Sequence, residues 1–350
     1  MYKVNLLGKN TFTFQNIFPY EYTENSDYDF DVFITDAFYL TLENRSEPLN
    51  LNDLKTKKLI IFNFDKCHID TLIESVDKVF GDTDIEVLLL TLHHITDKDK
   101  MPTHINHVGF DFFAFEMVNR KNNEDYIFNL VLDTIHFKRP KKFLCLNKVP
   151  HPHRVRLKEF MDREKFVNEG WFSFGEWWTE DWENLDVLGD YHCDHQFNTN
   201  LGLYLTSYFS IWTETLYDGE NIHSVKLTNK IFMSMLNLHP FFVVGQPKTL
   251  EYLRNAGFKT FGNFWNEGYD NQFNSEFRMN EIKHELRNIL SKSTETIHKE
   301  FYGQEWDGDR NKIYNTKMFK ILKHNYLFLP KHIENERKRV MNEINKFMSS

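Results

Sequence analysis

Residues 58–92 read KLIIFNFDKCHIDTLIESVDKVFGDTDIEVLLLTL, and this stretch decides the fold class. It opens with a run of strand-forming apolar residues at 58–64 and closes with a second such run at 85–92. Between the two runs, apolar residues recur at helical spacing over 68–80, and Gly81 supplies a helix stop. Continuous apolar strands around an amphipathic helix are typical of a parallel sheet, so the stretch predicts a β-α-β unit.

The same alternation extends in both directions from this unit. The segments 31–35 and 108–115 are further strand candidates in the first part of the chain. Beyond Pro140 the pattern of strand and helix returns twice and then gives way to helices. Strands are expected there at 143–147, 171–174, 208–213, 241–244 and 258–261, and helices at 153–166, 229–238 and 248–256, from about 275 onward, and at 331–348.

Two α/β halves of this kind predict a doubly wound α/β fold. Ligands in such folds bind at the carboxyl ends of the parallel strands, because helix N-termini and loops converge on that edge. We therefore expect a binding edge in the second half where predicted strands end, near Asn147, Glu214 and Gly245.

The composition indicates a globular chain and argues against a general binder of duplex DNA. The 350 residues are 41% hydrophobic, and 42 basic against 51 acidic residues give a net charge of −9, whereas duplex-DNA binders normally carry a basic footprint. The three cysteines, Cys67, Cys145 and Cys193, lie far apart and predict no disulfide framework. The first residues lack the apolar core of a signal peptide, and no stretch approaches ~18 apolar residues. We expect a cytoplasmic protein without a membrane span.

Three common nucleotide and hydrolase motifs are absent from the sequence. There is no P-loop, no G-x-G-x-x-G and no G-x-S-x-G. Their absence argues against P-loop enzymes, nicotinamide dehydrogenases and α/β-hydrolases.

The most informative stretch runs from 213 to 261 and contains the blocks TETLYDG, KLTNKIF and HPFFVVGQPKTLEYLRNAGFKTF. Together with FLCLNKVPHPHR at 143–154, these blocks resemble a family of glycosyltransferases found in bacteriophage and viral genomes. The LTNK block is also similar to the donor-site signature of fucosyltransferases of the GT-B fold, with Asn229 where that pattern has Glu. The resemblance covers roughly residues 142–270.

The resemblance implies two Rossmann-like domains that face each other across a cleft, as in the GT-B fold. Residues 1–139 would bind the acceptor and residues 140–280 the nucleotide sugar. Residues 281–350 would form a helical extension that packs back on the first domain. The implied reaction transfers a sugar from a nucleotide-diphosphate donor to an acceptor hydroxyl.

Basic residues at two predicted helix starts fit the diphosphate of such a donor. Thr228, Asn229 and Lys230 open one helix, whose free backbone N–H groups and positive dipole end favour an anion. Arg154 and Arg156 begin another helix at the same strand-end face, and an Arg fork suits phosphate geometry. These charges would stabilise the leaving diphosphate, so we expect no metal and no further cofactor.

Four other residues are donor-site candidates. Glu214 follows a predicted strand, where it contacts a ligand hydroxyl or, alternatively, serves as a helix cap or ion-pair partner. His153 is a candidate phosphate ligand or proton shuttle. Glu267 and Asp270 stand where the resemblance implies acidic residues that contact the sugar, with a polar loop as the alternative.

Three carboxylates of the first half are candidates for the catalytic base. Asp36, Asp65 and Glu116 each follow a predicted strand. A carboxylate in the cleft deprotonates an acceptor hydroxyl if its pKa is tuned upward, whereas structural capping is the alternative for all three.

Two other clusters have a function that the sequence leaves open. The run HCDH at 192–195 holds four possible metal ligands, and the pairs His93/His94, His104/His107 and His151/His153 are similar clusters. A closed zinc site needs more partners at suitable spacing and there is no C-x-x-C, so we expect no metal site. The Trp-rich segment 171–182 suits either sugar stacking or core packing.

The acceptor divides the glycosyltransferase hypothesis into two cases, a glycan and a hydroxylated base in phage DNA. Basic runs at 55–58 and 138–142 keep the DNA case open against the negative net charge. Two alternatives belong to other classes: a non-catalytic binding or structural module of the same fold, and a metal-dependent hydrolase built on the histidines.

Overall fold

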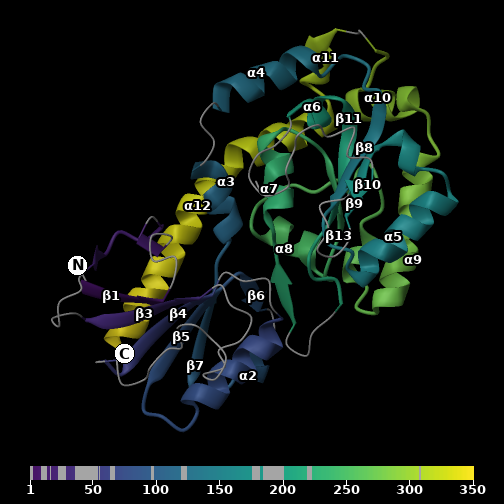
Figure 1. The fold of residues 1–350 in the computed structure, drawn as a ribbon. Coiled ribbons are helices and arrows are strands. Elements are labelled where there is room, and N and C mark those ends of the chain that lie inside the picture. The colour runs from purple at the N-terminus through teal and green to yellow at the C-terminus, as the bar shows by residue number, and fades with distance from the viewer. Residues whose placement is uncertain are drawn as a thin grey trace. The chain divides into compact units, whose positions relative to one another are not determined.

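The computed structural model describes the chain in segments that fall into two compact units (Figure 1). Unit 1 comprises Met1–Phe115, Glu220–Leu227 and Ile333–Ser350, and unit 2 comprises Glu116–Gly219 and Thr228–His332. The described residues are 3–8, 14–15, 17–22, 29–35, 54, 56–63, 68–95, 98–119, 124–175, 182–183, 201–218, 223–306 and 309–350.

Unit 1 is built on a six-stranded parallel sheet with the strand order β2-β1-β3-β4-β5-β7. The strands are β1 (Lys3–Gly8), β2 (Glu21–Tyr22), β3 (Phe30–Thr35), β4 (Lys58–Asn63), β5 (Glu86–Thr91) and β7 (Ile105–Gly109). Helix α2 (Ile69–Phe80) connects β4 to β5 and lies beside the sheet in Figure 1. The predicted β-α-β unit is therefore confirmed.

The core of that unit explains why the sequence pattern is reliable here. Leu72 and Val76 of α2 pack in one cluster with Leu59 and Ile61 of β4 and Leu89 of β5, and all five side chains are buried. Burying a Leu, Ile or Val side chain contributes about 1.5–3 kcal/mol. A shift of either pattern by one residue would therefore lose several such contributions.

A short antiparallel pair also belongs to unit 1. Strand β6 (His93–Ile95) pairs with β12 (Ser224–Lys226), and the Nδ1 atom of His93 lies 3.0 Å from the Ser224 hydroxyl oxygen. This pairing is the reason that Glu220–Leu227 belongs to unit 1.

The prediction of one strand over 108–115 is wrong beyond Gly109. Strand β7 ends at Gly109, and helix α3 (Phe112–Asn119) begins three residues later. The Asp111 carbonyl accepts hydrogen bonds from the N–H groups of Ala114 and Phe115, which form the first helical turn. A short apolar run such as FDFFAF does not distinguish a strand from a buried helix by periodicity alone.

Unit 2 is built on a five-stranded sheet with the order β10-β9-β8-β11-β13, parallel except for the β10–β9 pair. The strands are β8 (Lys141–Asn147), β9 (Trp171–Gly175), β10 (Trp182–Glu183), β11 (Ser207–Thr213) and β13 (Phe241–Val244). Every residue of the central strand β11 is buried. The expected strands of the second half are thus confirmed, apart from 258–261.

The expected helices of the second half are found as α5 (Pro152–Arg163), α7 (Asn229–Leu236) and α8 (Thr249–Asn255), whereas α4 (Glu124–Thr134) and α6 (Leu201–Leu205) were not expected. The chain then continues in α9 (Ser275–Leu290), α10 (Thr294–Tyr302), α11 (Arg310–Ile313) and α12 (Lys317–Ser349). Helix α12 contains Pro330, and its residues from 333 onward belong to unit 1. None of the helices in the described segments is both long enough and apolar enough to cross a bilayer.

The segment 258–261 is not a strand. The Lys259 N–H donates to Asn325 Oδ1 at 2.8 Å, and the Asn325 amide donates back to the Lys259 carbonyl at 2.8 Å. Asn325 belongs to α12, so a helix side chain satisfies the backbone groups that a sheet neighbour would have taken.

The units differ from the expected division at residues 139 and 280. The first segment of unit 1 ends at Phe115, and the same unit includes the 18 residues 333–350. The Lys58 ammonium, at the start of β4, donates to the Phe347 carbonyl at 2.7 Å, which attaches the end of α12 to this sheet. Helices α9, α10 and α11 belong to unit 2 rather than to a separate extension.

Candidate functional site

The carboxyl ends of three neighbouring strands form an edge of the unit 2 sheet. Strands β8, β11 and β13 are adjacent and parallel, and they end at Asn147, Thr213 and Val244. The Thr213 hydroxyl donates to the Asn147 amide oxygen, and the Glu214 N–H donates to the Val244 carbonyl at 2.9 Å. The expected strand ends near Asn147, Glu214 and Gly245 are confirmed, and we call this edge the unit 2 edge.

Glu214 is the most unusual group at this edge. Its side chain is 2% exposed, and neither carboxylate oxygen has a hydrogen-bond partner among the residues that the structure describes. A Cβ atom at Gly245 would lie 3.2 Å from Glu214 Cγ, so the absence of a side chain there makes room for Glu214. A buried carboxylate without hydrogen bonds is costly, and a bound molecule with hydroxyl or N–H donors would remove that cost.

Two more buried acceptors lie in other connecting stretches of unit 2. The Gln246 amide oxygen, directly after Gly245, and the Thr228 hydroxyl, at the N-cap of α7, have no hydrogen-bond partner in the described segments. Both residues are less than 5% exposed. Each of these oxygens, like those of Glu214, has the capacity to accept a hydrogen bond from a ligand.

Lys230 brings positive charge to the unit 2 edge. It lies in the first turn of α7, and its ammonium donates to the Thr213 carbonyl. A lysine in a first turn opposes the helix dipole, so its position here is electrostatically useful only beside an anion or a carbonyl end. Asn229, the first residue of α7, contacts the Met233 sulfur through its amide at 3.6 Å.

Arg154 is buried and holds the strand end in place. Its guanidinium donates to the carbonyls of Val149 at 2.9 Å, Thr213 at 3.1 Å and Glu214 at 3.2 Å. Burial lowers the pKa of Arg154 to about 10, while the Glu214 carboxylate acts in the opposite direction, so Arg154 is charged at neutral pH. The N–H groups that Arg154 would need to bind a phosphate in a bidentate fork are therefore already donated to these carbonyls.

His153 also serves the strand end. Its Nε2 atom lies 2.9 Å from the Glu214 carbonyl oxygen, and its ring stacks on Tyr217 with centroids 4.9 Å apart. Burial, and secondly the charge of Arg154, lowers the pKa of His153 to about 3. The imidazole is therefore neutral at pH 7 and does not shuttle protons there. Arg156 lies further out, in an ion pair with Glu276 of α9.

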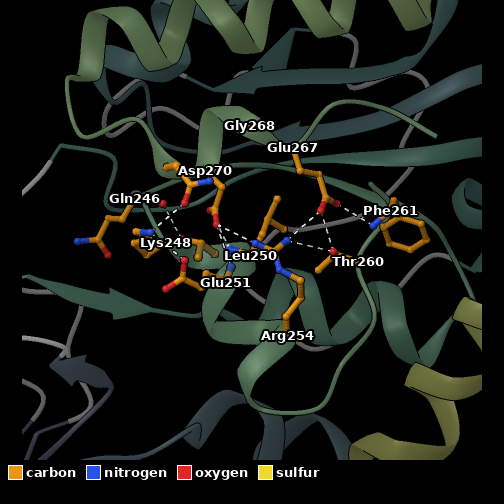
Figure 2. Close-up of polar contacts among 12 residues, drawn as sticks. Gln246, Lys248, Leu250, Glu251, Arg254, Thr260, Phe261, Glu267, Gly268 and Asp270 are labelled. Carbon is orange, nitrogen blue, oxygen red and sulfur yellow. Dashed lines mark hydrogen bonds and ion pairs between the residues drawn. The ribbon is translucent and has the colours of Figure 1, made fainter. Parts of the chain in front are cut away.

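Glu267 and Asp270 use their oxygens to fix the α8 region, as Figure 2 shows. Asp270 accepts from the N–H groups of Leu250 at 2.9 Å and Glu251 at 2.8 Å, which caps the start of α8. Glu267 accepts from the Phe261 N–H at 2.7 Å and from Thr260 and Arg254 (Figure 2).

Burial raises the pKa of both carboxyl groups, Glu267 and Asp270, against the lowering effect of these hydrogen bonds. Backbone and side-chain donors of unit 2 already occupy all four of their oxygens. The structure thus favours the structural alternative for both residues over contact with a sugar.

The candidates for the base and the two remaining clusters lie outside what the structure describes. Asp36, Asp65, the run at 192–195 and most of the Trp-rich segment are among the residues not described. Glu116 belongs to helix α3 and does not directly follow a strand, and its side chain is not described.

Sequence reasoning missed Arg278, a buried residue of α9 that is 1% exposed. Its guanidinium donates to the carbonyls of Gly245 at 3.2 Å, Gln272 at 2.7 Å and Tyr217, and lies 4.3 Å from the Tyr217 ring centroid. No sequence signal marks it, because SEFRMNEI resembles any exposed helix start. Gln246 was open to prediction, since it follows a predicted strand within GQP.

The comparisons with known proteins add no assignment. No protein-family model matches this chain, and no curated protein sequence matches it. The features that point to a function are the unit 2 edge and the resemblance of the sequence blocks at 143–154 and 213–261.

Proposed function

We propose that the protein is a glycosyltransferase that binds a nucleotide-diphosphate sugar at the unit 2 edge. The observation that carries the proposal is the Glu214 carboxylate, buried at the end of the central strand with two oxygens that lack hydrogen-bond partners in the described segments. A sugar nucleotide supplies what this position lacks, because its ribose and sugar hydroxyls are hydrogen-bond donors.

The positive charge at the edge suits the diphosphate. Lys230 and the N-terminal amides of α7 lie on the chain directly after Thr228, whose buried hydroxyl completes a polar helix start. In this proposal the bond between the anomeric carbon and the diphosphate oxygen breaks, and the diphosphate leaves with the bonding electrons. Lys230 and the amides stabilise the charge that develops there, so the transfer requires no metal.

An acceptor hydroxyl and a catalytic base complete the proposed reaction. The acceptor hydroxyl, of a glycan or a hydroxylated DNA base, attacks the anomeric carbon and loses its proton to a carboxylate of the first half. Asp36, Asp65 and Glu116 are the candidates. A facing arrangement of the two units as in the GT-B fold, and a cytoplasmic location, complete the proposal.

Calorimetry of the full chain with UDP and GDP, in the presence of EDTA, tests the donor site. We expect one of the two to bind with a submillimolar Kd that EDTA does not change. Lys230→Ala is expected to weaken that affinity by about 10- to 150-fold, the range of a charged hydrogen bond worth 1.5–3 kcal/mol.

Lys283→Ala is the matched control, since Lys283 lies on helix α9 of the same unit. No binding of either nucleotide, or equal affinities of the Lys230 and Lys283 variants, would place the donor elsewhere and refute the proposal. Binding without any transfer or hydrolysis of the bound sugar would favour the non-catalytic module, the alternative that Asn229 in place of Glu suggests.

A further inference from the structure

The carboxyl edge of the unit 1 sheet holds a different set of groups, which we call the His94 cluster. It consists of His94 in β6, Asp111 two residues after the end of β7, and Glu336 in the part of α12 that belongs to unit 1. One potential ligand atom from each of the three residues lies within 4.8 Å of the others. His94 Nε2 and Asp111 Oδ1 are 2.9 Å apart.

The surrounding chain is shaped to hold His94 in this position. A Cβ atom at Gly109 would lie 2.8 Å from His94 Nδ1 and 2.4 Å from the His93 carbonyl oxygen. Any residue larger than glycine would therefore push the imidazole away from Asp111. The Asp111 side chain is 2% exposed and the His94 side chain 12%, so both are largely removed from water.

Arg339 orients the third member of the cluster. Its guanidinium donates to both Glu336 oxygens, at 2.9 and 2.7 Å, and to the Gly109 carbonyl. A carboxylate has about four lone-pair sites, so this fork leaves Glu336 capacity for a metal. Outer hydrogen bonds of this kind are the usual support of metal-binding carboxylates.

The donor set matches a zinc-type cation. One imidazole nitrogen and two carboxylate oxygens are common zinc ligands, with bonds of about 2.0–2.2 Å. Tetrahedral ligands at such bond lengths lie about 3.3 Å apart, a value between the 2.9 Å of the His94–Asp111 pair and the 4.8 Å limit of the cluster. Two carboxylates and Arg339 sum to one negative charge, so the cluster attracts a cation.

We infer that the His94 cluster binds one Zn²⁺ ion, with water as a fourth ligand. The ion would tie α12 to the end of β7 and to β6 within unit 1. No step of the proposed sugar transfer passes through it, so this inference is independent of the proposed function.

Zinc titration of the full chain tests the inference. The protein is first dialysed against EDTA, and zinc is then titrated in competition with a chromophoric chelator. We expect one equivalent with a Kd below about 1 µM. His94→Gln and Glu336→Gln should each weaken the affinity by more than about 100-fold, beyond the 10- to 100-fold effect of an outer-shell change.

Two controls distinguish the cluster from other histidines. His104→Gln removes a histidine of unit 1 that pairs with Asp77 at 3.1 Å, and His192→Gln with His195→Gln removes the histidines of the 192–195 run. Both controls should retain full zinc affinity. Glu336→Gln keeps the size and hydrogen-bonding capacity of the side chain on helix α12, so it remains informative if His94→Gln fails to fold.

Circular dichroism establishes which variants are folded. Zinc should raise the unfolding temperature of the wild type but not that of His94→Gln or Glu336→Gln. Absence of stoichiometric zinc binding by the wild type would overturn the inference. Full affinity in a folded Glu336→Gln or His94→Gln variant, or loss of binding in the His192/His195 variant, would overturn it equally.

Discussion

The carboxyl edges of the two sheets differ in how their polar side chains are partnered. At the unit 1 edge, His94 contacts Asp111 and Glu336 contacts Arg339, so these side chains hold one another. At the unit 2 edge, the Glu214 oxygens lack hydrogen-bond partners among the described residues, although Glu214 is buried as deeply as Asp111. Two sheets of similar topology thus show that the strand arrangement provides an edge, whereas the residues after each strand decide what it binds.

The largest effect is expected from removal of the residue that fixes the unit 2 edge. Arg278→Met should lower the free energy of unfolding by about 3–5 kcal/mol, because several buried carbonyls lose their donors. Urea denaturation measures the change. Arg287→Ala, on the same helix, is the control, since its ion pair with Glu164 is exposed to solvent and contributes little to stability.

If Arg278→Met were no more destabilising than Arg287→Ala, the unit 2 edge would not depend on this guanidinium. The Gly245 and Tyr217 carbonyls would then accept hydrogen bonds from other donors when Arg278 is replaced.

The second expected effect is acid sensitivity of unit 2. Burial lowers the pKa of His153 and of His239 to about 3, against about 6.5 in the unfolded chain. Below pH 6.5 the unfolded state therefore binds protons that the native state does not, and stability falls as pH falls toward 3. At pH 5 the loss is about 2 kcal/mol for each histidine.

Hydrogen exchange at pH 7 and pH 5 measures this effect for each unit separately. Glu267 and Asp270, whose pKa values burial raises, act in the opposite direction and reduce the loss. In the variant His153→Asn, unfolding between pH 6.5 and pH 3 should take up one proton fewer, so the free energy of unfolding should depend less steeply on pH. A pH dependence identical in wild type and variant would mean that His153 titrates normally in the folded protein.

The smallest expected effect is a change in nucleotide-sugar affinity, and its measurement compares the two edges directly. Glu214→Gln should weaken nucleotide-sugar affinity by about 5- to 10-fold, as expected for one impaired hydrogen bond of about 1–1.4 kcal/mol, and should leave zinc affinity unchanged. Glu336→Gln should leave nucleotide-sugar affinity unchanged and weaken zinc affinity by more than about 100-fold. Calorimetry with the nucleotide sugar and the zinc titration, applied to both variants, make four measurements. Any result in which one variant changes both affinities would contradict the separation of the two edges.

The sequence predicted those parts of the fold in which one pattern had one physical solution. The β-α-β unit at 58–92 has long apolar runs and a helix that buries one face, and it is found as expected. The strand ends beside Asn147, Glu214 and Gly245 followed from the parallel order of these strands.

The rest depended on partners that are distant along the chain. Segment 258–261 is apolar enough for a strand, yet Asn325, 66 residues away from Lys259, satisfies its backbone. The roles of Asp270 and Arg278 likewise follow from carbonyls and N–H groups that only the folded chain brings near them. No local pattern contains that information, which is why the candidate edge was predictable and the roles of its residues were not.

The composition of unit 1 from three chain segments has a consequence for synthesis on the ribosome. N-terminal domains generally fold first during translation. Here Lys58, near the start of the chain, donates to the carbonyl of Phe347, and Arg339 donates to that of Gly109. Unit 1 therefore acquires its last helical turns only after every segment of unit 2 has been synthesised, because residues 333–350 follow all of those segments along the chain. For this protein, the half that is translated first is completed last.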